Sequence, residues 1–122
     1  MKGKNDMVKA GGRHLIVDYW GVEADKLSSC EEVDSIFRRG AEEAGATVLG
    51  SNFHHFGDGY GITGVVILSE SHMSIHTWPE KNYCAIDIFM CGDCDPRKTL
   101  KVLDLYFNSN YSKIDLLKRG EQ

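Results

Sequence analysis

The sequence predicts an α/β (α+β) fold, a two-layer sandwich in which two helices cover one face of a mostly antiparallel β-sheet. Three observations lead to this prediction. Several segments alternate apolar and polar residues with the period of a strand, and two others repeat their apolar residues at helical spacing. A Gly-Asp-Gly turn joins two neighbouring strands. Because each helix is amphipathic, both can bury one side against the same face of the sheet.

The first half of the chain predicts the order strand, helix, strand. Residues 13–20 alternate as a strand does. Two overlapping Ser-x-x-Glu capping boxes at 28–32 predict the start of a helix, and Gly45 is well placed to end it. Residues 47–56 are β-prone and alternate again, with Leu49 and Phe53 predicted on one face.

The second half predicts two further strands, a second helix and an edge strand. Residues 62–68 form a third strand that runs into a polar segment, and residues 83–91 form a fourth. Asp95-Pro96 is an N-cap followed by proline at the first helical position. The apolar residues that this helix turns inward are Leu100, Leu103, Tyr106 and Phe107. A short tail at 111–117 is expected at the sheet edge.

Composition restricts the class of protein. A chain of 122 residues is long enough for a single domain with one core. Its net charge of −4 argues against nucleic acid or an anionic membrane as a partner, since both bind basic faces. It has no apolar run long enough for a membrane span and no signal-peptide core at its start. We therefore expect a cytoplasmic protein with four reduced cysteines.

Residues 69–80 follow a buried strand and concentrate serines, histidines, carboxylates and a Trp-Pro. His72 and His76 are four residues apart, a spacing that can share a zinc ion on a helix. The β-branched Ile75 and Thr77 favour a strand, in which the two histidines share a face but lie about 13 Å apart. No metal site is predicted.

Two other chemistries receive little support. Cys91-Gly-Asp-Cys94 precedes a helix, as redox motifs do, but no second signal supports a dithiol enzyme. One reactive or buried thiol with a bystander is the favoured interpretation. A hydrolase built from Ser71, His76 and Asp87 would lack the Gly-x-Ser-x-Gly elbow.

Two long motifs stand out in the second half of the chain: Gly-Val-Val-Ile-Leu-Ser-Glu-Ser-His-Met-Ser-Ile-His-Thr-Trp-Pro-Glu at 64–80 and Tyr-Cys-Ala-Ile-Asp-Ile-Phe-Met-Cys-Gly at 83–92. Together they resemble the small prokaryotic S-adenosylmethionine decarboxylases, pyruvoyl enzymes made as self-cleaving proenzymes. Shorter matches extend the resemblance over residues 12–107, and the tail is expected to diverge.

The resemblance implies that the single domain, residues 1–122, cuts itself between Glu70 and Ser71 into a β chain, 1–70, and an α chain, 71–122. The Ser71 hydroxyl would attack the carbonyl of Glu70, assisted by the Thr63 hydroxyl. His76 would then act as the processing base on the Ser71 α-proton. Residue 71 would end as a covalent pyruvoyl group.

The resemblance also implies the roles in turnover. The substrate amine would form a Schiff base with the pyruvoyl group derived from Ser71, and Cys91 would be the proton donor. Phe56 and Tyr60 are candidates to stack on the substrate and Glu80 to bind its ribose hydroxyls. Phe53 is better explained by core packing.

The expected activity is decarboxylation of S-adenosylmethionine, which makes the aminopropyl donor for polyamine synthesis. Asp58 near the pocket leaves arginine or ornithine open as an alternative substrate of the same kind of enzyme. An unprocessed, non-enzymatic binding module is an alternative of another class. Members of the family are typically homodimers of αβ protomers, with sites formed by residues from both.

Overall fold

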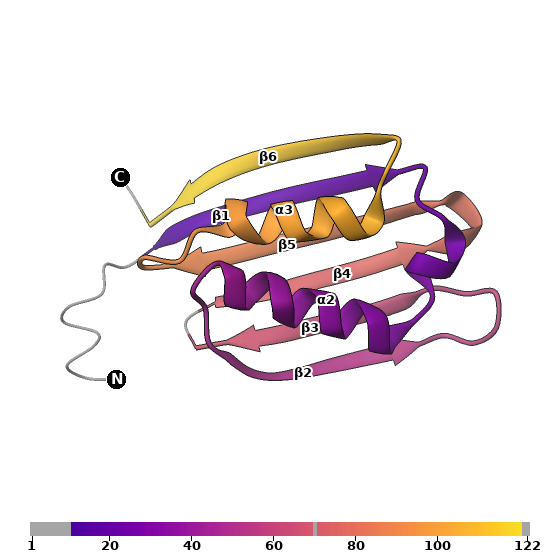
Figure 1. Ribbon diagram of the computed structural model, residues 1–122, viewed down its shortest axis with the longest axis horizontal. Helices are drawn as coiled ribbons and strands as arrows, with labels where there is room; N and C mark the ends of the chain where they lie inside the picture. The colour runs from indigo at the N-terminus through magenta and orange to yellow at the C-terminus, as the bar shows by residue number, and fades with distance from the viewer. Residues whose placement is uncertain (1–10, 70, 121–122) are drawn as a thin grey trace.

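Six β-strands and two α-helices make up most of residues 11–69 and 71–120, the part of the chain that this computed structural model describes (Figure 1). The strands form one sheet in the order β2-β3-β4-β5-β1-β6. In chain order the elements are β1 (Gly12–Trp20), the 3₁₀ turn η1 (Ala24–Leu27), α2 (Cys30–Glu43), β2 (Val48–His55), β3 (Ile62–Leu68), β4 (Ser71–Trp78), the 3₁₀ turn η2 (Pro79–Lys81), β5 (Tyr83–Cys91), α3 (Pro96–Phe107) and β6 (Tyr111–Arg119).

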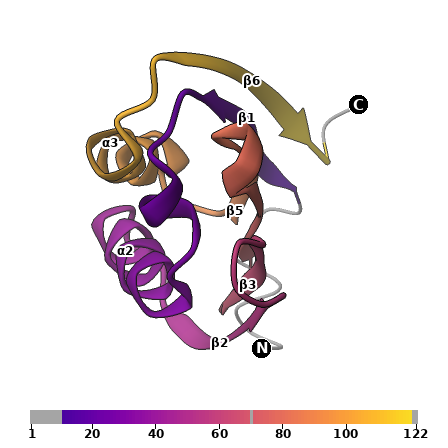
Figure 2. The ribbon, with the colours of Figure 1, turned by 90° about the vertical axis from the view of Figure 1, so that its right-hand side faces the viewer.

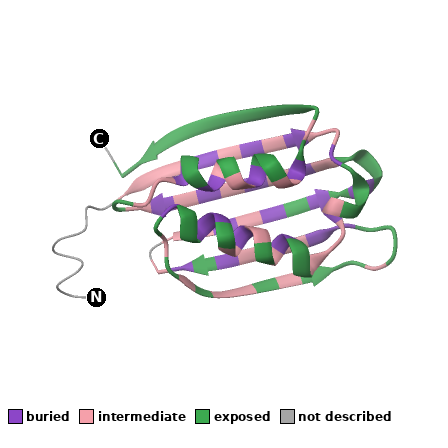
Figure 3. Ribbon diagram, viewed as in Figure 1, coloured by how far each residue is buried: buried purple, intermediate pink, exposed green. Residues whose placement is uncertain are grey.

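The predicted two-layer sandwich is confirmed. All five neighbouring strand pairs are antiparallel, and α2 and α3 lie side by side against the same face of the sheet (Figure 2). The helices approach closely at Gly40, whose carbonyl accepts a hydrogen bond of 2.8 Å from the Thr99 hydroxyl. Buried residues alternate along the central strands beneath the helices (Figure 3). The other side of the sheet, here called the open face, carries no helix in the described part of the chain.

The capping residues set the ends of both helices. Ser29 is the N-cap of α2, because its side chain accepts the Glu32 N–H at 3.1 Å, whereas Ser28 donates to Ala24 instead. Asp95 caps α3 by accepting the Arg97 N–H at 3.1 Å. The Arg97 side chain also donates to Asp95, which lowers the pKa of that carboxyl and keeps the cap ionised at neutral pH.

The sequence predicted four strands and an edge strand, and the structure contains one more. The segment after β3 forms β4, a separate strand that pairs antiparallel with β3 from Leu68↔Ser71 onward. Its buried positions are Met73, Ile75 and Thr77. The intervening serines and histidines hide this alternation, because they face the open side of the sheet and not the core.

The prediction that Leu49 and Phe53 lie on one face of β2 is wrong. Phe53 packs on the core against Phe37 with ring centroids 6.4 Å apart, as expected, but Leu49 is exposed. The pairing with β3 shifts register between Val48 and Gly50, which breaks the alternation of side chains. The predicted edge strand is confirmed as β6, beside β1.

Replacing Gly64 by alanine is expected to destabilise the protein by about 1–3 kcal/mol, the usual cost of overpacking. A Cβ at Gly64 would lie 2.1 Å from Cδ2 of Phe53, so the ring would have to leave its contact with the core. Urea unfolding measures the change. Gly50→Ala is the matched control, since a Cβ there meets nothing within 4 Å, and it should change stability by less than about 0.5 kcal/mol. Equal stability of the two variants would contradict the packing argument.

Candidate active site

The end of the sheet where β2 and β3 meet their loop contains a cavity of about 260 Å³. Its lining includes Phe56, Tyr60, Thr63, His76 and Glu80, all of which the sequence analysis named. Thr63 and His76 are cross-strand partners on the open face, and the Thr63 hydroxyl lies 3.1 Å from Nδ1 of the His76 ring. Phe56 and Tyr60 are both more than half exposed, so their rings are available to a ligand.

The loop that joins β2 and β3 forms part of the wall of this cavity. Gly57 and Gly59 both have positive φ, at +114° and +78°, which confirms the predicted turn. Asp58 is exposed and does not line the cavity. The acidic side chain that could have favoured a basic substrate is therefore absent from the cavity wall.

Ser71 and Cys91 lie toward the other end of β4. Ser71 is the first residue of β4 and lines a cavity of about 80 Å³ that is also lined by Cys94. The pairing His72↔Phe89, continued by one residue, sets Ser71 opposite the penultimate residue of β5, and Cys91 follows it. Glu70, on the other side of the predicted cleavage bond, lies outside the described residues.

The predicted processing residues therefore form two groups that do not meet within one chain. Ser71 and His76 are five positions apart on β4, about 16 Å at the rise of a strand. They also point to opposite sides of the sheet, because Ser71 pairs with the buried Leu68 and His76 with the open-face Thr63. A base at His76 cannot reach the α-carbon of Ser71 in the same protomer.

The sequence analysis missed a ladder of aromatic rings on the open face. Tyr111, Trp20, Tyr83 and Trp78 succeed one another across β6, β1, β5 and β4, with neighbouring ring centroids 5.2, 5.5 and 5.3 Å apart. Trp78 also lines the 260 Å³ cavity. Burial, together with a 2.6 Å hydrogen bond donated to Asp18, raises the pKa of Tyr83 to about 12. Register alone aligns these rings, so each strand by itself gave no signal.

The open face also holds His14, His72 and Asp87, whose nearest polar atoms all lie within 4.8 Å of one another. Two histidines and a carboxylate are a common set of metal ligands. Here, however, Nδ1 of His14 lies 3.0 Å from the Arg119 guanidinium, which only donates. His14 Nδ1 must therefore accept, and its Nε2 carries the proton that points at Asp87. A metal ion would need the lone pair at that Nε2, so the arrangement favours a hydrogen-bonded cluster.

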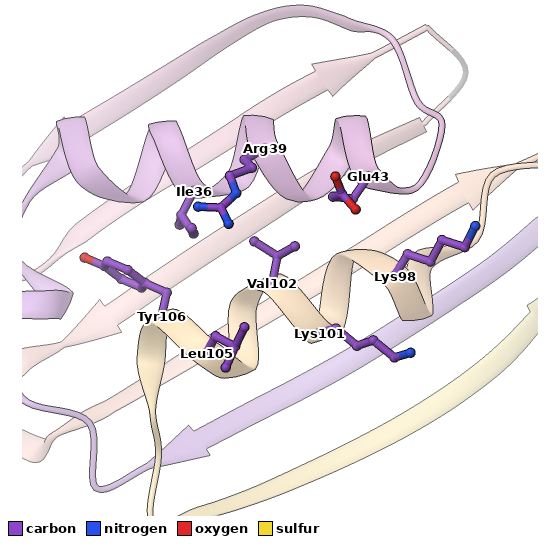
Figure 4. A pocket seen from close by; sticks show the side chains of 8 residues that line it. All are labelled: Ile36, Arg39, Glu43, Lys98, Lys101, Val102, Leu105 and Tyr106. Atoms are coloured by element: carbon purple, nitrogen blue, oxygen red, sulfur yellow. The ribbon is translucent and has the colours of Figure 1, made fainter.

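A cavity of about 720 Å³, larger than the two cavities described above, lies elsewhere, between the outward sides of α2 and α3 (Figure 4). Figure 4 shows Arg39, Glu43, Lys98 and Lys101 around the apolar Val102 and neighbouring side chains. None of the predicted site residues lines it. Its size does not make it the centre of the chemistry.

Comparison with known proteins shows the family of the chain. A family model described as S-adenosylmethionine decarboxylase matches residues 13–120. The S-adenosylmethionine decarboxylase proenzyme of Fervidobacterium nodosum is 39% identical over 115 residues, covering 93% of this chain and 83% of that protein. The proenzyme of the same name from Carboxydothermus hydrogenoformans is 42% identical over 114 residues, covering 93% and 89%. The chain belongs to the S-adenosylmethionine decarboxylase family.

A solved structure of the family has the same fold. The adenosylmethionine decarboxylase of Aquifex aeolicus matches with a TM-score of 0.83 and 30% identity, over 93% of this chain and 94% of that one. The family match runs to residue 120, so the expectation that the tail diverges after 107 is wrong. Strand β6 belongs to the family's fold. Among the described residues, no helix is both long and apolar enough to span a membrane.

Proposed function

We propose that this chain decarboxylates S-adenosylmethionine, the activity in the names of its relatives, and that it does so with a pyruvoyl group made from its own Ser71. One observation carries the proposal: Ser71 begins β4 directly after the turn that follows β3. A chain cut at such a turn stays assembled, because β4 remains paired with β3 on one side and β5 on the other. The β fragment, 1–70, and the α fragment, 71–122, form one αβ protomer.

The self-cleavage uses side chains in the order that the resemblance implies. The Ser71 hydroxyl attacks the carbonyl carbon of residue 70, and the peptide bond becomes an ester. A base, His76, removes the Ser71 α-proton, so the ester breaks and leaves a carboxylate on residue 70. Water then replaces the nitrogen of residue 71, ammonia departs, and a ketone remains on the α fragment. The Thr63 hydroxyl beside His76 fixes the ring and donates to or accepts from it.

We propose that the protein is a homodimer whose sites combine both chains. His76 needs a partner's Ser71, because the two cannot meet in one chain. The open face supplies the surface: the helices cover only the other side of the sheet, and the aromatic ladder lies on it. Two sheets could pack face to face with β4 antiparallel to its copy, on a two-fold axis level with residues 73 and 74. The backbone of each residue 71, which carries the α-proton, would then lie at the height of the other chain's His76, while the Ser71 side chain stays on the helix side of its own sheet.

The 260 Å³ cavity suits an adenosyl substrate. Phe56 and Tyr60 offer ring faces to the adenine and to the sulfonium cation, and the exposed Glu80 carboxylate can accept hydrogen bonds from ribose hydroxyls. Arginine and ornithine lack an aromatic base. Asp58, the side chain that could have favoured them, does not line the cavity.

A pyruvoyl group would stand at residue 71, where β4 begins, level with the end of β5. Cys91 ends β5 on the open face with Phe89 and Asp87, so its thiol would approach the substrate from that face and not from the side of the Ser71 side chain. The group supplies an electron sink when CO₂ leaves the substrate. Cys91 then returns a proton to the substrate's α-carbon, so its Sγ must hold the proton at that step.

Two measurements test the proposed function. Intact-mass analysis of the purified protein should show two fragments split at Glu70/Ser71, with the α fragment blocked by a pyruvoyl group. Release of labelled CO₂ should then occur from carboxyl-labelled S-adenosylmethionine and not from arginine or ornithine. A single uncleaved chain would leave the binding-module alternative in place of the enzyme.

Cys91→Ala should be cleaved but decarboxylate S-adenosylmethionine poorly, with kcat lowered by about 10²–10⁴-fold, the usual contribution of a positioned acid. Cleavage is spared because the thiol is assigned to turnover only. Steady-state CO₂ release gives kcat, and intact mass gives the extent of cleavage. Cys84→Ala is the control: that thiol is fully buried in the core and lines neither the 260 Å³ nor the 80 Å³ cavity. Normal turnover by Cys91→Ala would refute the assignment.

A further inference from the structure

A hydrogen-bonded cluster on the open face holds the residue next to Ser71. The His72 ring donates from Nε2 to Oδ1 of Asp87 on β5, at 3.0 Å. The Ser74 hydroxyl, two residues further along β4, donates to Oδ2 of the same carboxylate. Asp87 therefore joins both open-face residues at the start of β4 to the neighbouring strand.

Asp87 is itself fixed from β1 and β6. Nε2 of His14 lies 3.1 Å from the same Oδ1, and the Arg119 guanidinium lies 3.0 Å from Nδ1 of that ring. Since Arg119 only donates, the His14 ring must donate to Asp87. With the Ser74 hydroxyl on its other oxygen, this leaves Asp87 as an acceptor whose orientation is set from two sides.

The Phe89 ring contacts three side chains of the cluster. Its ring centroid lies 5.3 Å from that of His14 and 5.9 Å from that of His72, and the Arg119 guanidinium lies 5.5 Å above it. The His72 ring, whose side chain is 43% exposed, is thus held on one edge by a carboxylate and on another by an aromatic face. Four strands contribute to the placement of this one side chain.

The fixed position of the His72 side chain gains a role once the proposed cleavage has occurred. Before cleavage the turn ties Ser71 covalently to β3. Afterwards residue 71 is the first residue of a chain, and chain ends fray unless side chains tie them down. Its only remaining covalent bond is to His72.

We propose that Asp87 is a positioning residue, itself oriented by His14, that holds the His72 side chain by a hydrogen bond. After cleavage this contact keeps the new chain end, and the reactive ketone on it, in place. This inference rests on the proposed function and adds a role that cleavage creates. A misplacement of about 1 Å at a reacting group can cost about 10²-fold in rate. The His72–Asp87 contact is therefore expected to affect kcat and not the extent of self-cleavage.

His72→Ala tests the inference, and His72→Gln is the matched variant because its amide can still donate to Asp87. We expect both to be cleaved, His72→Ala to lose about 10–100-fold in kcat with a KM within a few-fold of normal, and His72→Gln to regain most of that loss. Should His72→Ala fail to fold, Asp87→Asn carries the same expectation from the β5 side.

Amide hydrogen exchange distinguishes a local positioning role of His72 from a general loss of stability. In cleaved protein, His72→Ala should speed exchange in the first residues of β4. In an uncleaved Ser71→Ala background the same change should leave that exchange near normal, since the turn still holds the strand. Equal acceleration in both backgrounds, failure of a folded His72→Ala chain to cleave, or normal kcat would each overturn the inference. Absence of cleavage in the unmodified protein would instead refute the proposed function.

Discussion

Ser71→Ala is expected to leave the protein as a single chain with no decarboxylase activity. The methyl side chain cannot attack the carbonyl of residue 70, so neither the ester nor the ketone can form. Because Ser71 lies at the start of a strand, half-buried and next to a turn, alanine fits its place without overpacking. Denaturing electrophoresis with intact mass should show one species of full length. Turnover should fall below detection.

Ser71→Cys distinguishes loss of the nucleophile from loss of the fold. A thiol on the same carbon can still attack, so we expect slower cleavage at the same bond. Circular dichroism of Ser71→Ala should match that of the parent protein. A Ser71→Ala chain that still splits between residues 70 and 71 would show that another group starts the cleavage.

Much of the fold could be predicted because local signals agreed with the tertiary structure. Ser29, Gly45 and Asp95 mark helix ends by local chemistry that needs no distant partner. Ile75 and Thr77 favoured a strand, but β4 was not counted as a separate one because its open-face positions hold histidine and serine, which weaken the apolar pattern. The shift between Val48 and Gly50 depends on how β2 pairs with β3, and so Leu49 was misplaced.

Motifs supply the residues of the candidate site, but they carry no geometry. Motifs named Thr63, His76 and Glu80, and the structure brings them to one cavity. Motifs could not show that Ser71 points to the opposite side of the sheet, since that follows from its pairing with Leu68. The cluster around Asp87 depends on the register of β1, β4, β5 and β6 together. Only the assembled sheet reveals it.

Mixing two inactive variants is expected to restore cleavage if each site combines two protomers. His76→Ala alone should remain uncleaved, because the processing base is missing, and Ser71→Ala alone should remain uncleaved for want of the nucleophile. In a mixed dimer, the intact Ser71 of the His76→Ala chain meets the intact His76 of the Ser71→Ala chain. That one site of the two is complete.

The pattern of fragments then identifies the arrangement. With distinguishable tags and equal co-expression, about half of the His76→Ala chains pair with the other variant and should be cut, while no Ser71→Ala chain is cut. Cleavage within one chain would give no fragments in the mixture, since neither variant carries both residues. Fragments from His76→Ala expressed alone would instead show that this histidine is not the base. We expect fragments of the His76→Ala chain in the mixture, because Ser71 and His76 lie about 16 Å apart along β4. A paired strand cannot bend enough to bring the two residues of one chain together.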